Sequence, residues 1–145
     1  MIEGMHQQFA AAGLLIAVTL FVHAIFIALA ALLFRNAHRE NAGALRVIQD
    51  SFLLIVIGLW LMAAHTIEIW MWAQLFLELA IFDDPETSFY FAAVSYTTLG
   101  FGDILIDPPW RLLAGAAAAD GLLLFGLSAA FLVEISVKLR LGGDR

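Results

Sequence analysis

Three long apolar segments, each bounded by charged residues, constrain the fold of this chain more than any other feature of its sequence. They cover approximately residues 9–34, 51–82 and 109–138. A helix of about 20 apolar residues crosses the ~30 Å hydrocarbon core of a bilayer, so each segment is long enough to span it. Hydrophobic residues make up 63% of the chain and charged residues only 14%, which leaves no room for a separate soluble domain. The sequence therefore predicts an all-α membrane protein with three transmembrane helices, for which membrane lipid is the first partner.

Composition also excludes several kinds of site and partner. The chain has no cysteine, so a disulfide, a thiolate nucleophile and a thiolate metal site are all impossible. Its formal net charge of −6 argues against nucleic acid as a partner.

The basic residues predict how the protein is oriented in the cell membrane. Six of the seven Lys and Arg residues lie in the link after the first segment or in the tail after the third: Arg35, Arg39, Arg46, Lys138, Arg140 and Arg145. With three spans, these two regions lie on the same side, which the positive-inside rule makes cytoplasmic. We therefore expect the N-terminus outside and the C-terminus in the cytoplasm.

The connection between the second and third segments is the most complex part of the chain. After Asp83 it contains a short apolar piece, residues 85–97, then a strand with two glycines and an exit loop. Asp84 before Pro85 predicts a helix start, because aspartate caps free N–H groups and proline suits the first helical position. A helix of this length cannot cross the bilayer. We therefore predict a re-entrant helix and loop, which are tolerated at membrane depth only inside protein or beside a water-filled cavity.

The strand that follows reads Ser-Tyr-Thr-Thr-Leu-Gly-Phe-Gly-Asp over residues 95–103. Glycine readily takes positive φ, so an extended segment can rotate successive peptide planes and direct its carbonyl oxygens to one side. Oxygens arranged in this way can replace the hydration shell of a cation, as they do in the Thr-Val-Gly-Tyr-Gly loop of potassium channels. The pattern indicates an ion selectivity filter.

With this motif between two spans, residues 51–138 resemble the pore module of tetrameric potassium channels, which consists of outer helix, pore helix, filter and inner helix. The resemblance implies a potassium-selective channel with passive conduction, no enzymatic activity and no cofactor beyond bound K⁺. Because one filter segment cannot enclose an ion, it also implies a homotetramer. Residues 1–50 would then form an additional membrane helix and cytoplasmic link, and residues 139–145 a short cytoplasmic tail.

The resemblance assigns ion binding to Thr98, Leu99, Gly100, Phe101 and Gly102. It assigns support of the filter to Thr97, Asp103, Tyr90 and Val94. Phe101 would pack outward against the pore helix, and Gly102 would turn the chain at the outer mouth.

Three residues depart from the usual family pattern. Leu99 stands where valine or isoleucine is usual, and Phe101 replaces the commoner tyrosine. Val94 occupies a place where some members carry a glutamate that pairs with the aspartate after the filter. Tyr90 is therefore the remaining candidate donor to Asp103.

The inner helix, residues 109–138, carries glycines and one acidic residue. The resemblance implies a gating hinge in this helix, for which Gly121 and Gly126 are the candidates, although glycine also allows close packing between membrane helices. Asp120 could face the central cavity and concentrate cations, or it could be a buried aspartate bonded to the pore helix or a neighbouring subunit.

Two further ionisable residues, His65 and Glu68, share a face of the second span, and His23 in the first span is a possible partner. They could form a structural hydrogen bond, a proton-sensitive gate or part of a metal site. Two alternatives to a potassium channel follow. One is a poorly selective monovalent cation channel with a filter loosened by Leu99, and the other is a helix bundle with a metal or proton site on these three residues. We expect the first span to pack peripherally on the second.

Overall fold

The computed structural model describes residues 2–36 and 44–141. Within these ranges the chain is helical and contains no strand. Its elements are α1 (Ile2–Asn36), α2 (Ala44–Glu78), α3 (Pro85–Tyr96), the 3₁₀ turn η1 (Pro108–Trp110) and α4 (Arg111–Leu141). Three apolar helical segments, in α1, in α2 and in η1 with α4, are long enough to cross a membrane. The predicted all-α membrane fold is confirmed.

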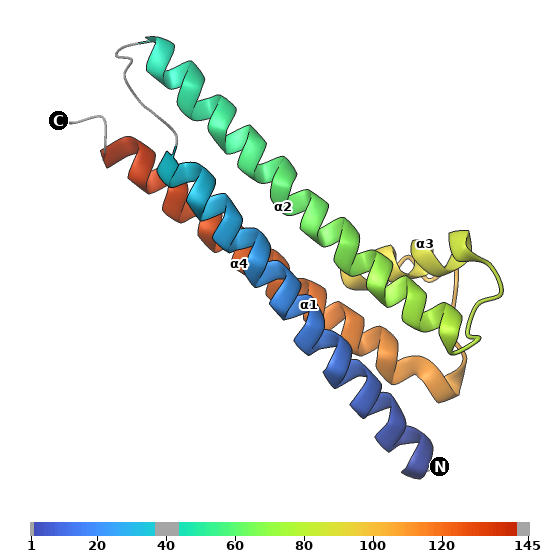
Figure 1. The fold of residues 1–145 in the computed structure, drawn as a ribbon. Helices are drawn as coiled ribbons and strands as arrows, with labels where there is room; N and C mark the ends of the chain where they lie inside the picture. Colours follow the sequence, from blue (N-terminus) through green and yellow to red (C-terminus); the bar gives the residue numbers. More distant parts are fainter. Residues whose placement is uncertain (1, 37–43, 142–145) are drawn as a thin grey trace.

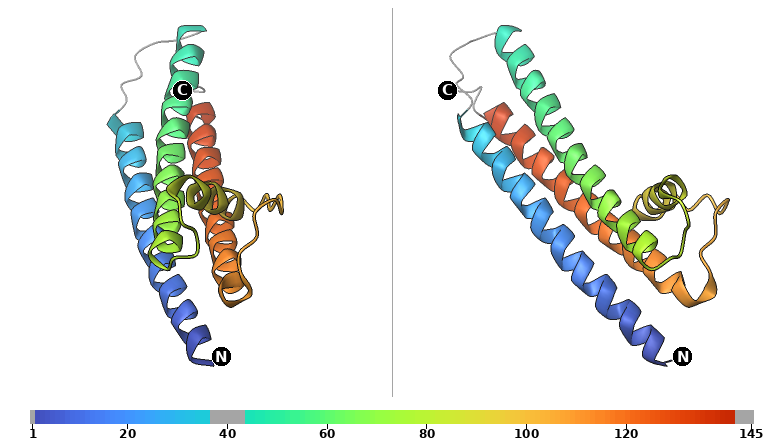
Figure 2. Two further views of the ribbon diagram at one scale, coloured as in Figure 1. Left: turned by 90° about the vertical axis from the view of Figure 1, so that its right-hand side faces the viewer. Right: turned by 45° about the vertical axis from the view of Figure 1, so that its right-hand side comes forward.

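The three long helices lie alongside one another, and the short helix α3 packs against α2 and α4 near one end of the bundle (Figures 1 and 2). The end of α1, the start of α2 and the end of α4 lie at the opposite end (Figure 1). The described basic residues of the link and tail gather there, as the charge pattern predicted: Arg35, Arg46, Lys138 and Arg140. Arg39 and Arg145 lie outside the described residues.

Helix α1 packs on α2, as expected, and it also packs against α4, which the sequence did not predict. Polar contacts explain the difference, because Thr19 of α1 donates a hydrogen bond to Asp120 of α4 over 2.8 Å. A segment that is apolar on every side does not reveal which neighbours it will have.

Helix α2 is displaced relative to the predicted segment 51–82. It begins earlier, at Ala44, where an ion pair between Arg46 and Asp50 one turn later (3.6 Å) supports a polar first turn. It ends earlier because Ala80 adopts the left-handed conformation (φ 51°). The amides of Ala80 and Ile81 then bond back to α2, which is the pattern of a Schellman C-cap. Glycine usually occupies such a position, so the apolar sequence hides this helix end.

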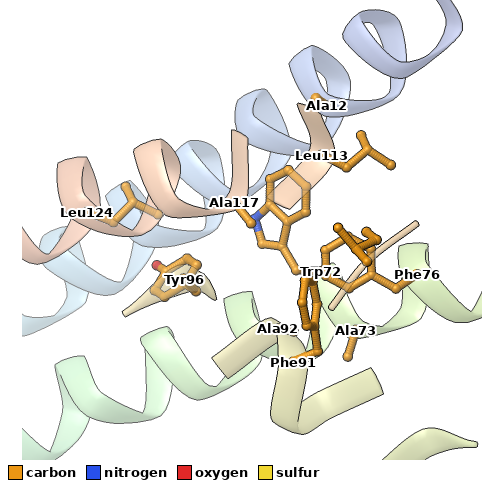
Figure 3. Packing of buried hydrophobic residues seen from close by; sticks show 11 residues of the cluster. Ala12, Trp72, Ala73, Phe76, Phe91, Ala92, Tyr96, Leu113, Ala117 and Leu124 are labelled. Atoms are coloured by element: carbon orange, nitrogen blue, oxygen red, sulfur yellow. The ribbon is translucent and has the colours of Figure 1, made fainter. Parts of the chain in front are cut away.

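Helix α3 starts as predicted, with the Asp84 carboxylate accepting a hydrogen bond from the Thr87 amide over 2.8 Å. Its buried side docks on α2, where the Ser88 hydroxyl donates to the Ala73 carbonyl over 2.7 Å. Figure 3 shows the apolar core that fixes this helix, to which α2, α3 and α4 all contribute. Its largest members are Trp72, Phe76, Phe91, Tyr96, Leu113 and Leu124. This core sets the position of the segment that follows α3.

Candidate ion-conduction site

Backbone conformation sets residues 97–103 apart from an ordinary loop. Thr98, Gly100 and Gly102 have positive φ values of 60°, 55° and 76°, whereas Leu99 and Phe101 between them do not. Two of these positions are glycines, which adopt positive φ without steric cost. At Thr98 a β-branched residue takes this conformation, which is strained and is typical of functional sites. The alternating sign of φ rotates successive peptide planes so that carbonyl oxygens can lie on one side.

Hydrogen bonds attach the start of this segment to the last turn of α3. The amides of Leu99 and Gly100 donate to the Val94 carbonyl over 3.0 and 3.3 Å, and the Thr98 amide donates to Ser95 over 2.9 Å. The Thr97 hydroxyl donates to the Ala93 carbonyl over 2.6 Å. Val94 thus supports the segment through its backbone, a role that its side chain could not reveal.

The carbonyl oxygens of residues 98–102 remain available. No other residue of the described ranges 2–36 and 44–141 donates a hydrogen bond to them. Because a carbonyl oxygen is a strong acceptor, such a row normally requires water, a cation or another chain as its partner.

Side chains of this segment face away from their own chain. Leu99 is 60% exposed and Phe101 is 65% exposed. The expected packing of Phe101 on the pore helix is therefore not made within one chain. Beside the segment lies a hollow of about 340 Å³, bordered by α3, the exit loop and the start of α4, with Val94, Leu105 and Arg111 among its lining residues.

Asp103 after the second glycine has the partner that the sequence predicted. The Tyr90 hydroxyl donates to the Asp103 carboxylate over 2.6 Å, and the Ile104 amide donates to its other oxygen over 3.0 Å. The Tyr90 hydrogen bond lowers the pKa of Asp103 below its ordinary value, because it favours the ionised carboxylate. The same contact raises the pKa of Tyr90. Asp103 is thereby held as an anion at the end of the carbonyl row.

Gly121 of α4 lies against the backbone of α3. A Cβ atom at this position would come within 1.9 Å of the Tyr96 carbonyl oxygen and 2.7 Å of its carbon. Nothing lies within 4 Å of a Cβ built at Gly126. Helix α4 continues without a break through both glycines. Close helix packing therefore accounts for Gly121, while a hinge at either glycine remains a prediction.

Asp120, the candidate cavity residue, is directed towards α1 and α2. Its side chain is buried, and one carboxylate oxygen accepts hydrogen bonds from Thr19 over 2.8 Å and from the Trp72 indole over 2.9 Å. This position favours the second interpretation, a buried structural aspartate, although its partners are α1 and α2 rather than α3.

One turn further along the bundle, the candidate residues His23, His65 and Glu68 come together. Glu68 Oε1 lies 2.8 Å from His23 Nδ1, and Glu68 Oε2 lies 3.1 Å from His65 Nδ1. Tyr96 and Ser128 complete the cluster, and sequence reasoning missed both. The only available signal was a hydroxyl in each of two apolar helices. The ligand atoms of the two histidines and Glu68 lie within 4.8 Å of one another, so these three side chains could also hold a metal ion.

The chain thus combines three helices long enough to cross a membrane, a short helix packed at one end, and a glycine segment whose carbonyls accept no hydrogen bond from the described residues. A family model described as "Ion channel" matches residues 63–138, just over half of the chain. The match extends from the middle of α2 to the last turn of α4 and includes α3 and the glycine segment. The chain belongs to this family and is an integral membrane ion channel. No curated protein and no solved structure matched the chain.

Proposed function

We propose that this channel conducts potassium passively and selectively through rings of carbonyl oxygens from residues 98–101, with the Thr98 hydroxyl at the inner end. The observation that carries this proposal is the alternation of positive φ at Thr98, Gly100 and Gly102 beside carbonyls that no described residue of the chain donates to. Rings of such oxygens replace the hydration shell of K⁺ in filters of this kind.

The pore helix supports the same site electrostatically. Helix α3 ends at Tyr96, directly before the filter, and the C-terminal end of a helix carries a partial negative charge. In the proposed assembly this end points at the central cavity, where it favours a dehydrating cation. The acidic group at the outer mouth, Asp103, adds attraction for cations entering from outside.

A homotetramer completes the filter, because one chain supplies one row of oxygens. The exposed side chain of Phe101 and the hollow lined by Val94 and Leu105 support this assembly, since a ring of subunits requires complementary, non-identical surfaces. In our proposal, Phe101 of each subunit enters the hollow of its neighbour. The basic end of the bundle faces the cytoplasm, and conduction requires no catalysis and no cofactor beyond bound K⁺.

Reversal potentials in liposomes test the selectivity. Purified protein in opposing K⁺ and Na⁺ gradients should give a reversal potential close to the K⁺ equilibrium value. The second candidate, a poorly selective cation channel, is favoured by the exposed Leu99 side chain, which is not packed behind its own filter. A potential that does not move when K⁺ and Na⁺ are exchanged would establish that candidate and refute potassium selectivity.

Gly100→Ala tests the filter itself. Gly100 has φ of 55°, which an L side chain rarely adopts, so alanine should turn the peptide planes and abolish flux with the assembly intact. Gly58→Ala is the matched control, because Gly58 lies in α2 and nothing lies within 4 Å of a Cβ built there. Flux and cross-linked oligomer size are measured together. Unchanged conduction in Gly100→Ala would refute the filter assignment.

A further inference from the structure

A cluster of five buried polar side chains joins all four helices outside the filter. Its members are His23 of α1, His65 and Glu68 of α2, Tyr96 of α3 and Ser128 of α4, none of them more than 6% exposed. Such a group is costly at membrane depth unless every polar atom has a partner, so the number of hydrogens in the cluster can be counted.

Three donors converge on the carboxylate of Glu68. His23 Nδ1 lies 2.8 Å from Oε1, and His65 Nδ1 lies 3.1 Å from Oε2. The Tyr96 hydroxyl donates to Oε2 over 2.5 Å. With Glu68 ionised, each imidazole must therefore carry its hydrogen on Nδ1, which leaves both Nε2 atoms as acceptors.

Both Nε2 atoms face the same hydroxyl. Ser128 Oγ lies 3.0 Å from His65 Nε2 and 3.1 Å from His23 Nε2. A serine hydroxyl carries one hydrogen and can serve only one of them. With two neutral rings, the other contact would set one lone pair against another. One additional hydrogen removes this conflict, because one ring then donates to Ser128 while Ser128 donates to the other ring.

We propose that this cluster is a proton-binding site that holds one proton more than a carboxylate and two neutral imidazoles. The count does not depend on where the proton resides. If Glu68 is protonated instead, it donates to one Nδ1, and that ring donates from Nε2 to Ser128. In either arrangement each of the five contacts described above has one hydrogen, and the longer contact between His65 Nδ1 and the Tyr96 hydroxyl (3.2 Å) has none of its own.

Charge balance requires the same proton. Among the described residues, no Lys or Arg forms an ion pair with Glu68, and its only basic partners are His23 and His65. Asp120 of α4 lies about one turn away, and its carboxyl group accepts hydrogen bonds from Thr19 and Trp72. The remaining facing groups are neutral, namely the Tyr96 hydroxyl and the Phe125 ring, which stacks on His65 at 3.9 Å. One additional proton within the cluster neutralises the Glu68 carboxylate without a Lys or Arg partner.

The cluster is connected to the filter through Tyr96, and this part of the inference rests on the proposed potassium conduction. Tyr96 is the last residue of α3 and precedes Thr98 by two positions. Loss of the proton would leave a buried carboxylate uncompensated and one Ser128 contact without hydrogen. The end of α3 would then lose its fixed position, so potassium flux should fall as the pH rises.

Reversible unfolding in mixed micelles between pH 7 and 9 tests the proton site without ion flux. Free histidine and glutamate are deprotonated in this range, so the unfolded chain lacks the proton that the folded cluster holds. The stabilisation is complete at low pH and is lost as the pH rises through the point where the folded cluster releases its proton. Before that point, the unfolding equilibrium constant should rise about tenfold per pH unit, as one bound proton requires. A wild-type protein with no such slope would overturn the proposal.

Glu68→Gln is the discriminating variant. The amide can donate to Tyr96, whose hydroxyl turns to His65 Nδ1, 3.2 Å away, and the chain through Ser128 to His23 closes without an extra proton. The slope should therefore disappear. His6→Gln, at an exposed histidine, is the matched control and should keep it. A Glu68→Gln slope equal to that of the wild type would refute the count. If Glu68→Gln does not fold, the pH slope of wild-type unfolding and the histidine ¹⁵N spectra of the wild type still show whether the cluster holds the additional proton.

Tyr96→Phe separates the proton site from its effect on conduction. This variant keeps both Ser128 contacts, so its unfolding equilibrium constant should still rise with pH as in the wild type. The pH dependence of its potassium flux should be lost. Equal pH dependence of flux in Tyr96→Phe and wild type would overturn the connection to the filter. A wild type with the slope but without flux at any pH would support the proton site and refute the channel proposal. Stoichiometric zinc retained by the purified wild type, with both Nε2 atoms bound, would overturn the proton assignment.

Discussion

Replacing Gly121 by alanine should push α4 away from the end of α3. The added Cβ would lie 1.9 Å from the Tyr96 carbonyl oxygen, where real Cβ atoms essentially never come under 3.0 Å. The gap must therefore open by about 1.1 Å, the difference between these distances. The atom in the way belongs to the backbone, and Tyr96 is held by its hydrogen bond to Glu68, so a side-chain rotation cannot relieve the contact.

The expected cost follows from two opposing effects. Overpacking a well-packed core typically costs about 1–3 kcal/mol. Alanine recovers up to about 1 kcal/mol of helix propensity relative to glycine. We therefore expect Gly121→Ala to lower the free energy of unfolding by about 1–2 kcal/mol. Flux should also fall, because the displaced carbonyl lies two residues before Thr98.

Gly126→Ala is the matched control in the same helix. Nothing lies within 4 Å of its Cβ, so the variant should be neutral or more stable by up to about 1 kcal/mol. Unfolding in mixed micelles and K⁺ flux in liposomes are measured for both variants. Equal stability of Gly121→Ala and wild type would refute the packing argument. Unchanged stability with a loss of flux would instead favour the gating hinge.

Two further predictions concern the aspartates. Tyr90→Phe removes the hydrogen bond that lowers the pKa of Asp103. In the wild type the charged Asp103 attracts cations at pH values above its ordinary pKa, and this attraction is lost as the pH falls through the lowered pKa. Without the hydrogen bond, Asp103 takes up its proton at a higher pH, so acid should reduce the flux of the variant at a higher outer pH than that of the wild type. Coincident flux–pH curves of the two proteins would contradict this. Asp120→Asn should leave unitary conductance unchanged but destabilise the fold by about 1–3 kcal/mol. If the amide oxygen faces Thr19 and Trp72, the amide NH₂ group is buried without an acceptor; if the NH₂ group faces them, both donors lose their acceptor. Reduced conductance at unchanged stability, measured by single-channel recording and unfolding, would instead place this carboxylate in the cavity.

The sequence alone determined the features that depend on local chemistry. Long apolar segments must become helices in a bilayer, because no water is available there for the backbone. Asp84 and Pro85 determine the start of α3, since capping involves only residues within one turn. The glycines at 100 and 102 permit positive φ, and the structure has positive φ at both positions.

Only the tertiary structure decided which side of each helix faces which neighbour. The spans are apolar on nearly every side, so periodicity does not specify their rotation, and the partner of Asp120 could not be inferred. The pairing of His23 with Ser128 joins residues more than 100 positions apart. Gly121 is required by a backbone on another helix, and α2 ends at an alanine in the left-handed conformation. These features arise from packing between distant segments, whereas the filter motif and the span lengths are written in neighbouring residues.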